Sequence, residues 1–248
     1  MRTRSSLLQL CAALLGLLAG CSSPKVLPDN GQSVVVVHGL GRSPASMKLL
    51  VSRIEDAGYS VINFGYPSTE EPIEELAALL GAEVEESFGE ERGSVHFVTH
   101  SMGGVLVRSY LAQQPKPHSG RVVMLSPPNQ GSEIIDAFAD SELLSALLGP
   151  AGMELGTEPD GVASELGPVR FSLGVITGDR SLSPLGSWLI PGPDDGKVAV
   201  DHAAVEGAAD FKVVHATHTF IMNRKDVADE VVHFLEHGHF QERERGDD

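Results

Sequence analysis

The sequence predicts an α/β protein whose core is a doubly wound, mostly parallel sheet of about six strands. Apolar runs of strand length alternate along the chain with segments in which apolar residues recur at helical spacing. The first run, residues 32–38, contains four consecutive valines, which is typical of a parallel strand covered by helices on both faces. Because strand and helix alternate, right-handed crossovers and an open parallel sheet are expected.

Short connections join the strands and helices in the first half of the chain. After the valine-rich strand, Ser43 is placed to cap a helix that has Pro44 in its first turn. A second strand is predicted at residues 59–64. Pro72 then opens a helix with apolar residues at helical spacing, and residues 95–99 form the third predicted strand.

The second half of the chain completes the predicted sheet. We expect a helix at residues 102–113 and a fourth strand at residues 121–125. Two further strands are predicted at residues 171–177 and 211–216, and a closing helix at residues 226–237. With 248 residues, the chain is long enough to bury one core and short for two catalytic domains.

A helical insertion is predicted between the fourth and fifth strands, at about residues 129–170. It is long for a connection, rich in leucine and isoleucine, and broken by Gly149 and Pro150. Two interpretations stay open. The segment forms one or two crossover helices that pack on the sheet, or it forms a cap whose apolar side shelters an acyl pocket.

The first residues of the chain predict export. Two arginines precede an apolar run at residues 7–19, as in secretory signals, and the run is too short to span a bilayer comfortably. Leu-Ala-Gly before Cys21 resembles the lipobox of bacterial lipoproteins, which implies a signal peptide at residues 1–20 and lipidation of Cys21. An ordinary cleaved signal or an uncleaved anchor is the alternative. Ser22 resembles the outer-membrane sorting signal, so we expect a lipid-anchored protein of the bacterial cell envelope, on the outer membrane and facing the periplasm.

The remaining sequence divides into a linker at residues 21–32, a domain at residues 33–240 that includes the possible cap at 129–170, and a flexible acidic tail at residues 241–248. Two of the 18 basic residues and none of the 34 acidic residues lie in the predicted signal, so its removal changes the net charge from −16 to −18. Such a surface repels nucleic acid and anionic lipid. We expect no nucleic-acid partner, and membrane attachment through the N-terminal lipid anchor alone.

Residues 99–104, Thr-His-Ser-Met-Gly-Gly, carry the strongest catalytic signal. A nucleophilic serine must be exposed at the carboxyl edge of the sheet, so its strand has to turn sharply into a helix, with small residues where the backbones crowd. This segment directly follows the third predicted strand and precedes a helix. It matches the G-x-S-x-G pattern except that Thr99 replaces the first glycine. We predict Ser101 as the nucleophile; no cysteine follows Cys21, so the mature domain has no cysteine nucleophile.

A glycine-rich turn, His-Gly-Leu-Gly at residues 38–41, leaves the first strand. It resembles the H-G-x-G oxyanion loop of lipases and esterases. The resemblance implies that the backbone amides of Leu40 and Met102 bind the oxyanion that forms when Ser101 attacks a carbonyl group. Fixed backbone donors stabilise such a charge better than water does, because they need not reorganise.

The general base is expected to be a histidine after the last strand, because the order in such sites is Ser, then acid, then His. His218 follows the strand predicted at residues 211–216, whereas His215 falls within it and would point to a sheet face. We therefore predict His218 as the base. His233 and His237 lie four residues apart but lack a paired Glu motif, so we predict no metal site, and we expect no cofactor.

Four aspartates between the fifth strand and His218 compete for the role of the acid: Asp179, Asp194, Asp195 and Asp201. Asp179 lies close behind the fifth strand, which is the simplest geometry. Asp195 begins the sequence Asp-Gly-Lys-Val, which resembles the D-G-x-V acid loop of bacterial lipase-like hydrolases. The resemblance favours Asp195 as the residue that orients the imidazole and stabilises its charged form, with Asp179 as the alternative.

From about Val34 to the last helix, these ordered motifs resemble the α/β-hydrolase superfamily and, within it, minimal bacterial lipases and carboxylesterases. Residues 127–132, Pro-Pro-Asn-Gln-Gly-Ser, are also similar to the P-x-x-G-S segment of lipases and of GPI-inositol-deacylase-like proteins. The resemblance implies a serine carboxylesterase or lipase-like hydrolase (EC 3.1.1 class) that cleaves acyl or lipid esters through an acyl-enzyme. The alternatives are an acyltransferase, thioesterase or peptidase on the same triad, and a non-catalytic envelope lipoprotein.

Overall fold

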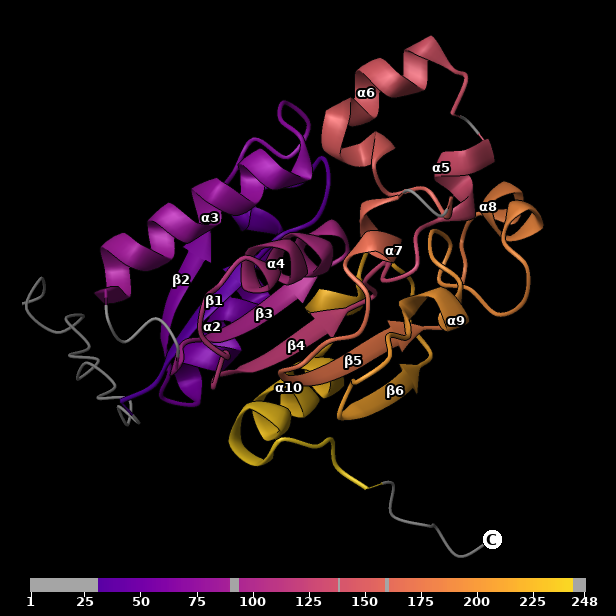
Figure 1. Ribbon diagram of the computed structural model, residues 1–248. Coiled ribbons are helices and arrows are strands. Elements are labelled where there is room, and N and C mark those ends of the chain that lie inside the picture. Colours follow the sequence, from indigo (N-terminus) through magenta and orange to yellow (C-terminus); the bar gives the residue numbers. More distant parts are fainter. Residues whose placement is uncertain (1–30, 90–93, 138, 159–160, 243–248) are drawn as a thin grey trace, which may run out of the picture.

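The computed structural model describes residues 31–89, 94–137, 139–158 and 161–242 (Figure 1). In these ranges, six parallel strands form one sheet in the order β2-β1-β3-β4-β5-β6. The strands are β1 (Ser33–Val37), β2 (Ser60–Phe64), β3 (His96–His100), β4 (Arg121–Leu125), β5 (Ser172–Gly178) and β6 (Asp210–Val214). The predicted fold class, an α/β protein with a mostly parallel sheet of about six strands, is confirmed.

Helices lie on both faces of this sheet (Figure 1). In chain order, the described helices and 3-10 turns are η1 (Pro44–Met47), α2 (Lys48–Asp56), α3 (Ile73–Phe88), α4 (Met102–Ala112), α5 (Glu133–Ala137), α6 (Glu142–Met153), α7 (Val162–Glu165), α8 (Pro184–Leu189), α9 (Val200–Ala203), η3 (Ile221–Asn223) and α10 (Lys225–His237). The helices α3 and α4 cover one face, and α2 and α10 cover the other. The alternation of strand and helix thus produces a doubly wound sheet.

The valine-rich strand β1 is buried on both faces, which explains its composition. Val35 and Val37 pack with side chains of α3 and α4, whereas Val34 and Val36 pack with those of α2 and α10. All four valines are fully buried. Burial of a side chain of this size contributes roughly 1.5–3 kcal/mol, so this strand anchors both halves of the core.

Two predicted boundaries differ from the structure. The helix after β1 begins as a 3-10 turn and becomes α-helical only at Lys48, and the Ser43 side chain makes no capping hydrogen bond. The last strand, β6, ends at Val214. Val214 pairs with Gly178, which is the last residue of the neighbouring strand β5. His215 therefore follows the strand, and the expectation that it falls within a strand is wrong.

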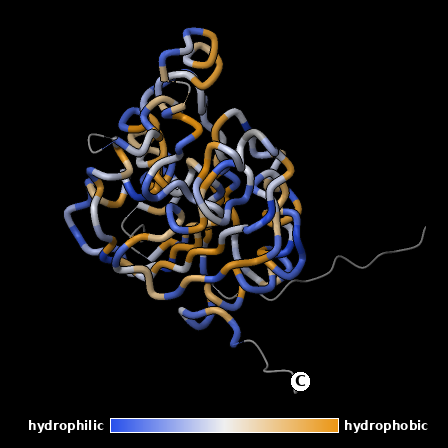
Figure 2. The backbone as a smooth tube through the Cα atoms, turned by 90° about the vertical axis from the view of Figure 1, so that its right-hand side faces the viewer, coloured by the Kyte–Doolittle hydropathy of each residue, from blue (hydrophilic) through white to orange (hydrophobic). Residues whose placement is uncertain are grey.

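The insertion after β4 contains two different parts. The helix α6 stands away from the sheet (Figure 1), and its Leu143 and Leu147 side chains are 81% and 68% exposed. Figure 2 shows hydrophobic residues on this projection, at the top of the view. The helix α7 packs on the core instead, where Ala163 is buried and Val162 contacts the cluster beneath α4. Hence α6 has the position of a cap, and α7 that of a crossover helix.

The N-terminal predictions lie outside the described residues. These are the signal peptide at residues 1–20, Cys21 and most of the linker at 21–32, and most of the tail at 241–248 is outside as well. Within the ranges that the structure covers, no helix is both long enough and apolar enough to cross a membrane.

A buried arginine of α4, Arg108, ties the insertion to the rest of the protein. Its guanidinium donates to the backbone and side-chain oxygens of Asn129 at 2.9 and 3.2 Å, and to the carbonyls of Ala163 and Gly167 at 3.3 and 2.7 Å. Burial lowers the pKa of Arg108 to about 10, so the group stays charged at neutral pH. One cation thus joins both ends of the insertion to the helix after β3.

We expect Arg108→Met to lower the free energy of unfolding by about 2–4 kcal/mol, because it leaves buried carbonyl groups without donors. Urea unfolding followed by circular dichroism measures this loss. Arg170→Met removes an exposed cation and is expected to change stability by less than about 0.5 kcal/mol. Equal effects of the two substitutions would contradict the role of Arg108.

Candidate active site

Ser101 lies in a sharp turn between β3 and α4. Its φ and ψ angles are 55° and −129°, a conformation that residues other than glycine rarely adopt. The Ser101 amide donates to the Leu125 carbonyl, and the Gly104 amide donates to the Ser101 carbonyl, both at 2.9 Å. These bonds hold a strained residue at the carboxyl edge of the sheet, where it borders a cavity.

Glycines at two positions allow the backbones around Ser101 to touch. A Cβ atom on Gly103 would lie 2.7 Å from the carbonyl oxygens of both Val37 and His38. A Cβ atom on Gly39 would lie 2.9 Å from the Cβ atom of Ser101. The turn after β1 therefore lies directly against the turn after β3, and a larger residue at either position would force the two turns apart.

Thr99 replaces the first glycine of the motif without widening the turn. Its side chain is fully buried, and its hydroxyl would lie 3.3 Å from a Cβ atom on Gly104. That Cβ atom would also lie 3.0 Å from a side-chain atom of Pro127 and 3.1 Å from the Met124 sulfur. Glycine at 104 therefore leaves the space that Thr99 and its neighbours occupy.

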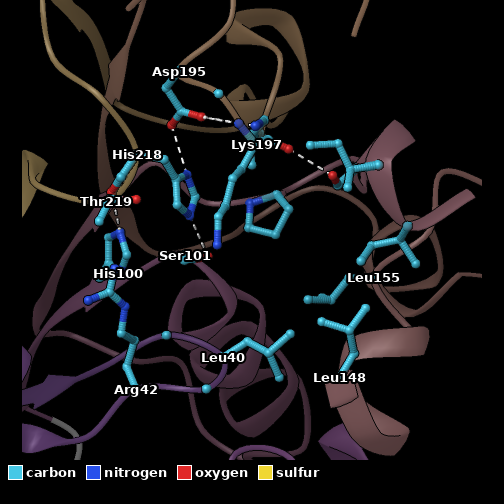
Figure 3. Close-up of a pocket in the computed structure, with 18 of the residues that line it drawn as sticks. Leu40, Arg42, His100, Ser101, Leu148, Leu155, Asp195, Lys197, His218 and Thr219 are labelled. Atoms are coloured by element: carbon cyan, nitrogen blue, oxygen red, sulfur yellow. Dashed lines mark hydrogen bonds and ion pairs between the residues drawn. The ribbon is translucent and has the colours of Figure 1, made fainter. Parts of the chain in front are cut away.

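The structure brings Ser101, His218 and Asp195 together in one chain of hydrogen bonds (Figure 3). His218 Nε2 lies 2.9 Å from Ser101 Oγ, and His218 Nδ1 lies 2.9 Å from Asp195 Oδ2. Because the Nδ1–H group donates its hydrogen bond to the carboxylate, Nε2 is left unprotonated and can accept the serine hydroxyl proton. The His218 amide also donates to the Asp195 carbonyl at 2.9 Å, so backbone and side chain join the same two residues.

The Asp195 carboxylate is buried and fully engaged. Its Oδ1 accepts the amides of Lys197 and Val198 at 3.1 and 2.9 Å, in addition to the bond with the ring of His218. Burial alone would raise the pKa of this carboxyl. The neighbouring His218 ring and the amide of Val198 outweigh that effect and hold the pKa below its ordinary value. Asp195 is thereby kept ionised beside the imidazole.

The competing candidates lie elsewhere. Asp179 accepts from His215 Nδ1 at 3.0 Å in a solvent-exposed pair, so the alternative acid and the alternative histidine bind each other. Asp194 accepts the Gly196 amide and the hydroxyl of Ser187 through one oxygen. Asp201 is exposed on α9. None of these three carboxylates contacts His218.

The turn after β1 is held in place by Tyr66 and Ser68. The Tyr66 hydroxyl donates to the His38 carbonyl at 2.6 Å, and its ring stacks on the imidazole of His38 with 4.3 Å between centroids. Burial lowers the pKa of His38, so this ring stays neutral. The Gly41 amide donates to the Ser68 hydroxyl at 3.0 Å. Both ends of the turn are therefore anchored from one loop.

Two backbone amides, those of Leu40 and Met102, are available beside Ser101. Met102 is the first residue of α4, so its amide has no acceptor inside the helix. The Leu40 amide donates no hydrogen bond to any part of the chain that the structure describes. These amides can serve as donors to an oxygen bound next to Ser101.

His100 holds the loop that carries His218 in place. Its Nε2 donates to the His218 carbonyl at 2.9 Å, and its side chain is buried. Burial holds the pKa of His100 well below its ordinary value, and the neighbouring His218 lowers it further. His100 is therefore a neutral donor with a structural role.

A cavity of about 540 Å³ opens onto Ser101 and His218. Figure 3 shows Leu40, Leu148 and Leu155 together on one side of the serine. Most of the wall is apolar. Its apolar side chains include one from the turn after β1 and several from the insertion: Leu40, Ile134, Ile135, Leu144, Leu148 and Leu155. The α6 segment thus supplies part of the cavity wall.

Sequence reasoning missed three residues at this site. Arg42 and Lys197 line the cavity. The sequence motifs did not mark them, because Arg42 follows the His-Gly-Leu-Gly turn and Lys197 occupies the variable position of Asp-Gly-Lys-Val. Ser132 donates to the Lys197 carbonyl at 2.8 Å and so fastens the loop that carries Asp195. The P-x-x-G-S segment contained the signal for Ser132, but its role depends on a contact with a distant loop. In the described ranges, no group of three metal-ligating side chains comes together.

Comparison with known proteins identifies the fold. A family model described as "Alpha/beta hydrolase family" matches residues 34–240, which is most of the chain. No curated protein matches the sequence.

Solved structures with similar folds include three enzymes. The mature lipase BlEst2 of Bacillus licheniformis has a TM-score of 0.62 at 20% identity, covering 80% of this chain and 90% of that one. The phospholipase PlaB of Legionella pneumophila has a TM-score of 0.62 at 16% identity, covering 84% of this chain and 60% of that one. A monoacylglycerol lipase of Paleococcus ferrophilus has a TM-score of 0.57 at 17% identity, covering 86% and 96%. At such identities the likeness is one of fold.

We expect Gly103→Ala to destabilise the protein by about 3 kcal/mol or more, since its Cβ atom would collide with two backbone carbonyls that cannot move aside. Gly81→Ala is the matched control, because its Cβ atom would lie 3.3 Å from the Tyr110 ring inside α3. We expect that control to change stability by less than about 1 kcal/mol. Urea unfolding of both variants provides the comparison, and a mild effect of Gly103→Ala would refute the tight contact.

Proposed function

The chain belongs to the alpha/beta hydrolase family, and from this premise we propose that it is a serine hydrolase that cleaves carboxylic esters. One observation carries the proposal: Ser101, His218 and Asp195 are linked by two hydrogen bonds of 2.9 Å at the border of a cavity. Nucleophile, base and orienting acid in hydrogen-bond reach form the arrangement that activates a serine for attack on a carbonyl.

In the proposed acylation step, Ser101 Oγ attacks the ester carbonyl carbon while His218 Nε2 accepts the hydroxyl proton. The tetrahedral intermediate collapses when the bond between its carbon and the alcohol oxygen breaks. His218 returns the proton to that oxygen, so the alcohol leaves neutral. Asp195 stays ionised and stabilises the imidazolium, in agreement with the lowered pKa of its carboxyl.

In the proposed deacylation step, water attacks the acyl carbon on Ser101, and His218 accepts its proton. The bond to Oγ breaks, the serine regains a proton from His218, and the free acid leaves. In both steps the amides of Leu40 and Met102 donate to the negative oxygen of the intermediate. The anchored turn after β1 supports this role, because donors that are already oriented need no rearrangement.

We propose acyl or lipid esters as the substrates. Part of the rim of the cavity is apolar and exposed: Leu147, Leu182 and Phe220 line it and are 68%, 65% and 54% exposed. Exposed apolar side chains around a cavity favour an amphiphilic ligand over a small polar one. The predicted lipid at Cys21 would hold the enzyme at a bacterial membrane, where such substrates are found.

We expect Ser101→Ala to abolish labelling by a fluorophosphonate probe and turnover of p-nitrophenyl esters, because the attacking oxygen is removed. Gel fluorescence and absorbance measure the two activities, and circular dichroism checks the fold. Ser164→Ala, an exposed serine of α7, is the control and should keep both activities. Labelling or turnover that persists in a folded Ser101→Ala protein would remove the proposal.

The two candidate acids can be separated by matched substitutions. We expect Asp195→Asn to lower kcat about a thousandfold or more, because the imidazole loses the carboxylate that fixes its tautomer and stabilises its charge. Asp179→Asn breaks only the exposed pair with His215 and should leave kcat unchanged. Steady-state kinetics on one p-nitrophenyl ester compares them. A large loss in Asp179→Asn alone would assign the acid to that residue.

A further inference from the structure

Two cations at the cavity, Arg42 and Lys197, form no ion pair with an acidic side chain that the structure describes. Arg42 follows the turn after β1, Lys197 lies between α8 and α9, and both line the same cavity as Ser101. Three other described cations, Lys212, Arg224 and Lys225, form ion pairs with nearby acidic side chains. No ion pair or side-chain hydrogen bond of Arg42 or Lys197 occurs in the ranges that the structure describes.

Figure 3 shows these two side chains approaching Ser101 from separate loops. The Lys197 chain runs beside the ring of His218 toward the serine, and the Arg42 guanidinium reaches toward His100. Desolvation within the cavity wall lowers the pKa of the Lys197 ammonium, and the positive charge of Arg42 lowers it further, while the charge of Asp195 opposes these effects without outweighing them. Two like charges are thus held near the nucleophile against their mutual repulsion, which an anion between them would relieve.

Among the described residues at the cavity, no acidic side chain forms an ion pair with either cation. Asp195 is the one carboxylate among the described residues that line it, and its oxygens already accept from His218 and from two backbone amides. His100 is neutral because of its burial. The rest of the wall is apolar or carries hydroxyl groups. An anion for this pair of cations must therefore come from a bound molecule.

We propose that Arg42 and Lys197 form an anion-binding subsite beside Ser101, which receives a phosphate group of the substrate. The inference rests on the proposed ester hydrolysis and narrows it to acyl esters of phosphorylated alcohols, such as acylglycerol phosphates and phospholipids. Phosphate oxygens can accept from both cations at once, and a guanidinium can donate two parallel bonds. The acyl chain then lies against Leu148 and Leu155, with the phosphate a few bonds from the scissile ester.

The net negative charge of the protein makes a preference for anionic esters a specific sign of the subsite. A net charge of −16 disfavours the approach of any anion over long distances. Without a subsite, an anionic ester would therefore react more slowly than a neutral one with the same acyl chain. At contact distance two unpaired cations outweigh the diffuse repulsion, because salt screens distant charges more than close ones. A preference for the anionic ester is the signature of the subsite.

The test compares two soluble substrates with the same acyl group, 1-octanoylglycerol and 1-octanoylglycerol 3-phosphate, with the full-length protein. We expect kcat/KM to be higher by about tenfold or more for the phosphorylated ester than for the neutral one, because hydrogen bonds to charged groups contribute that much binding free energy. Arg42→Gln and Lys197→Gln should each lower this ratio by about tenfold or less, and the double variant should remove the preference. The ratio is independent of the concentration of active enzyme.

Matched controls separate the subsite from net charge and from folding. Lys116→Gln and Arg170→Gln remove exposed cations that precede β4 and β5, at the opposite edge of the sheet, and should leave the ratio unchanged. Arg42→Lys and Lys197→Arg keep the charge and should keep most of the preference. Thermal unfolding of each variant identifies any that fail to fold.

The outcomes that overturn the subsite are distinct from those that overturn ester hydrolysis. The subsite is refuted, while ester hydrolysis stands, if the unmodified protein does not prefer the phosphorylated ester over the neutral one. It is also refuted if Arg42→Gln and Lys197→Gln leave the ratio of the two kcat/KM values unchanged. Competition by inorganic phosphate without a preference for the phosphorylated ester assigns the cations to free phosphate and also refutes it. If neither substrate is cleaved and the fluorophosphonate probe does not label Ser101, both proposals fail.

Discussion

The contact between the turn after β1 and the turn after β3 is the constraint on which the site depends. The chain leaves β1 for β2 on one side and returns to β3 on the other, so β1 and β3 are neighbours at a reversal of strand order. Such a reversal opens a crevice at the carboxyl edge of a parallel sheet. Here Gly39 and Gly103 allow the backbones to touch, which sets the Leu40 amide beside Ser101.

The other two members of the site come from loops, and loops need cross-links to hold a geometry. His218 is tied twice, because its amide donates to the Asp195 carbonyl and its own carbonyl accepts from His100. Ser132 ties the neighbouring Lys197 carbonyl to the insertion. Each of these donors is neutral or part of the backbone. Among the described residues that line the cavity, Asp195 is the only one with a carboxylate, and this carboxylate is hydrogen-bonded to the imidazole.

The sequence predicted what depends on local pattern and chain order, and it left open what depends on distant contacts. The strands, Ser101 and His218 follow from periodicity and from the order of motifs. The acid was ambiguous because Asp179 and Asp195 both follow β5, and only the folded chain pairs Asp179 with His215. The leucines of residues 129–170 fit a cap and a crossover equally well, since helical spacing does not say what covers a face. Arg42 and Lys197 meet only because separate loops converge.

The unpaired cations also bear on the chemistry of His218. In the proposed acylation step the imidazole would become positively charged, and two cations near Ser101 would oppose that change. Asp195 is the only carboxylate among the described residues that line the cavity. A substrate phosphate between Arg42 and Lys197 would offset both charges and so favour the imidazolium. Under the proposed subsite, the anionic part of the substrate thus contributes to catalysis as well as to binding, because it makes proton transfer to His218 easier when an ester is in place.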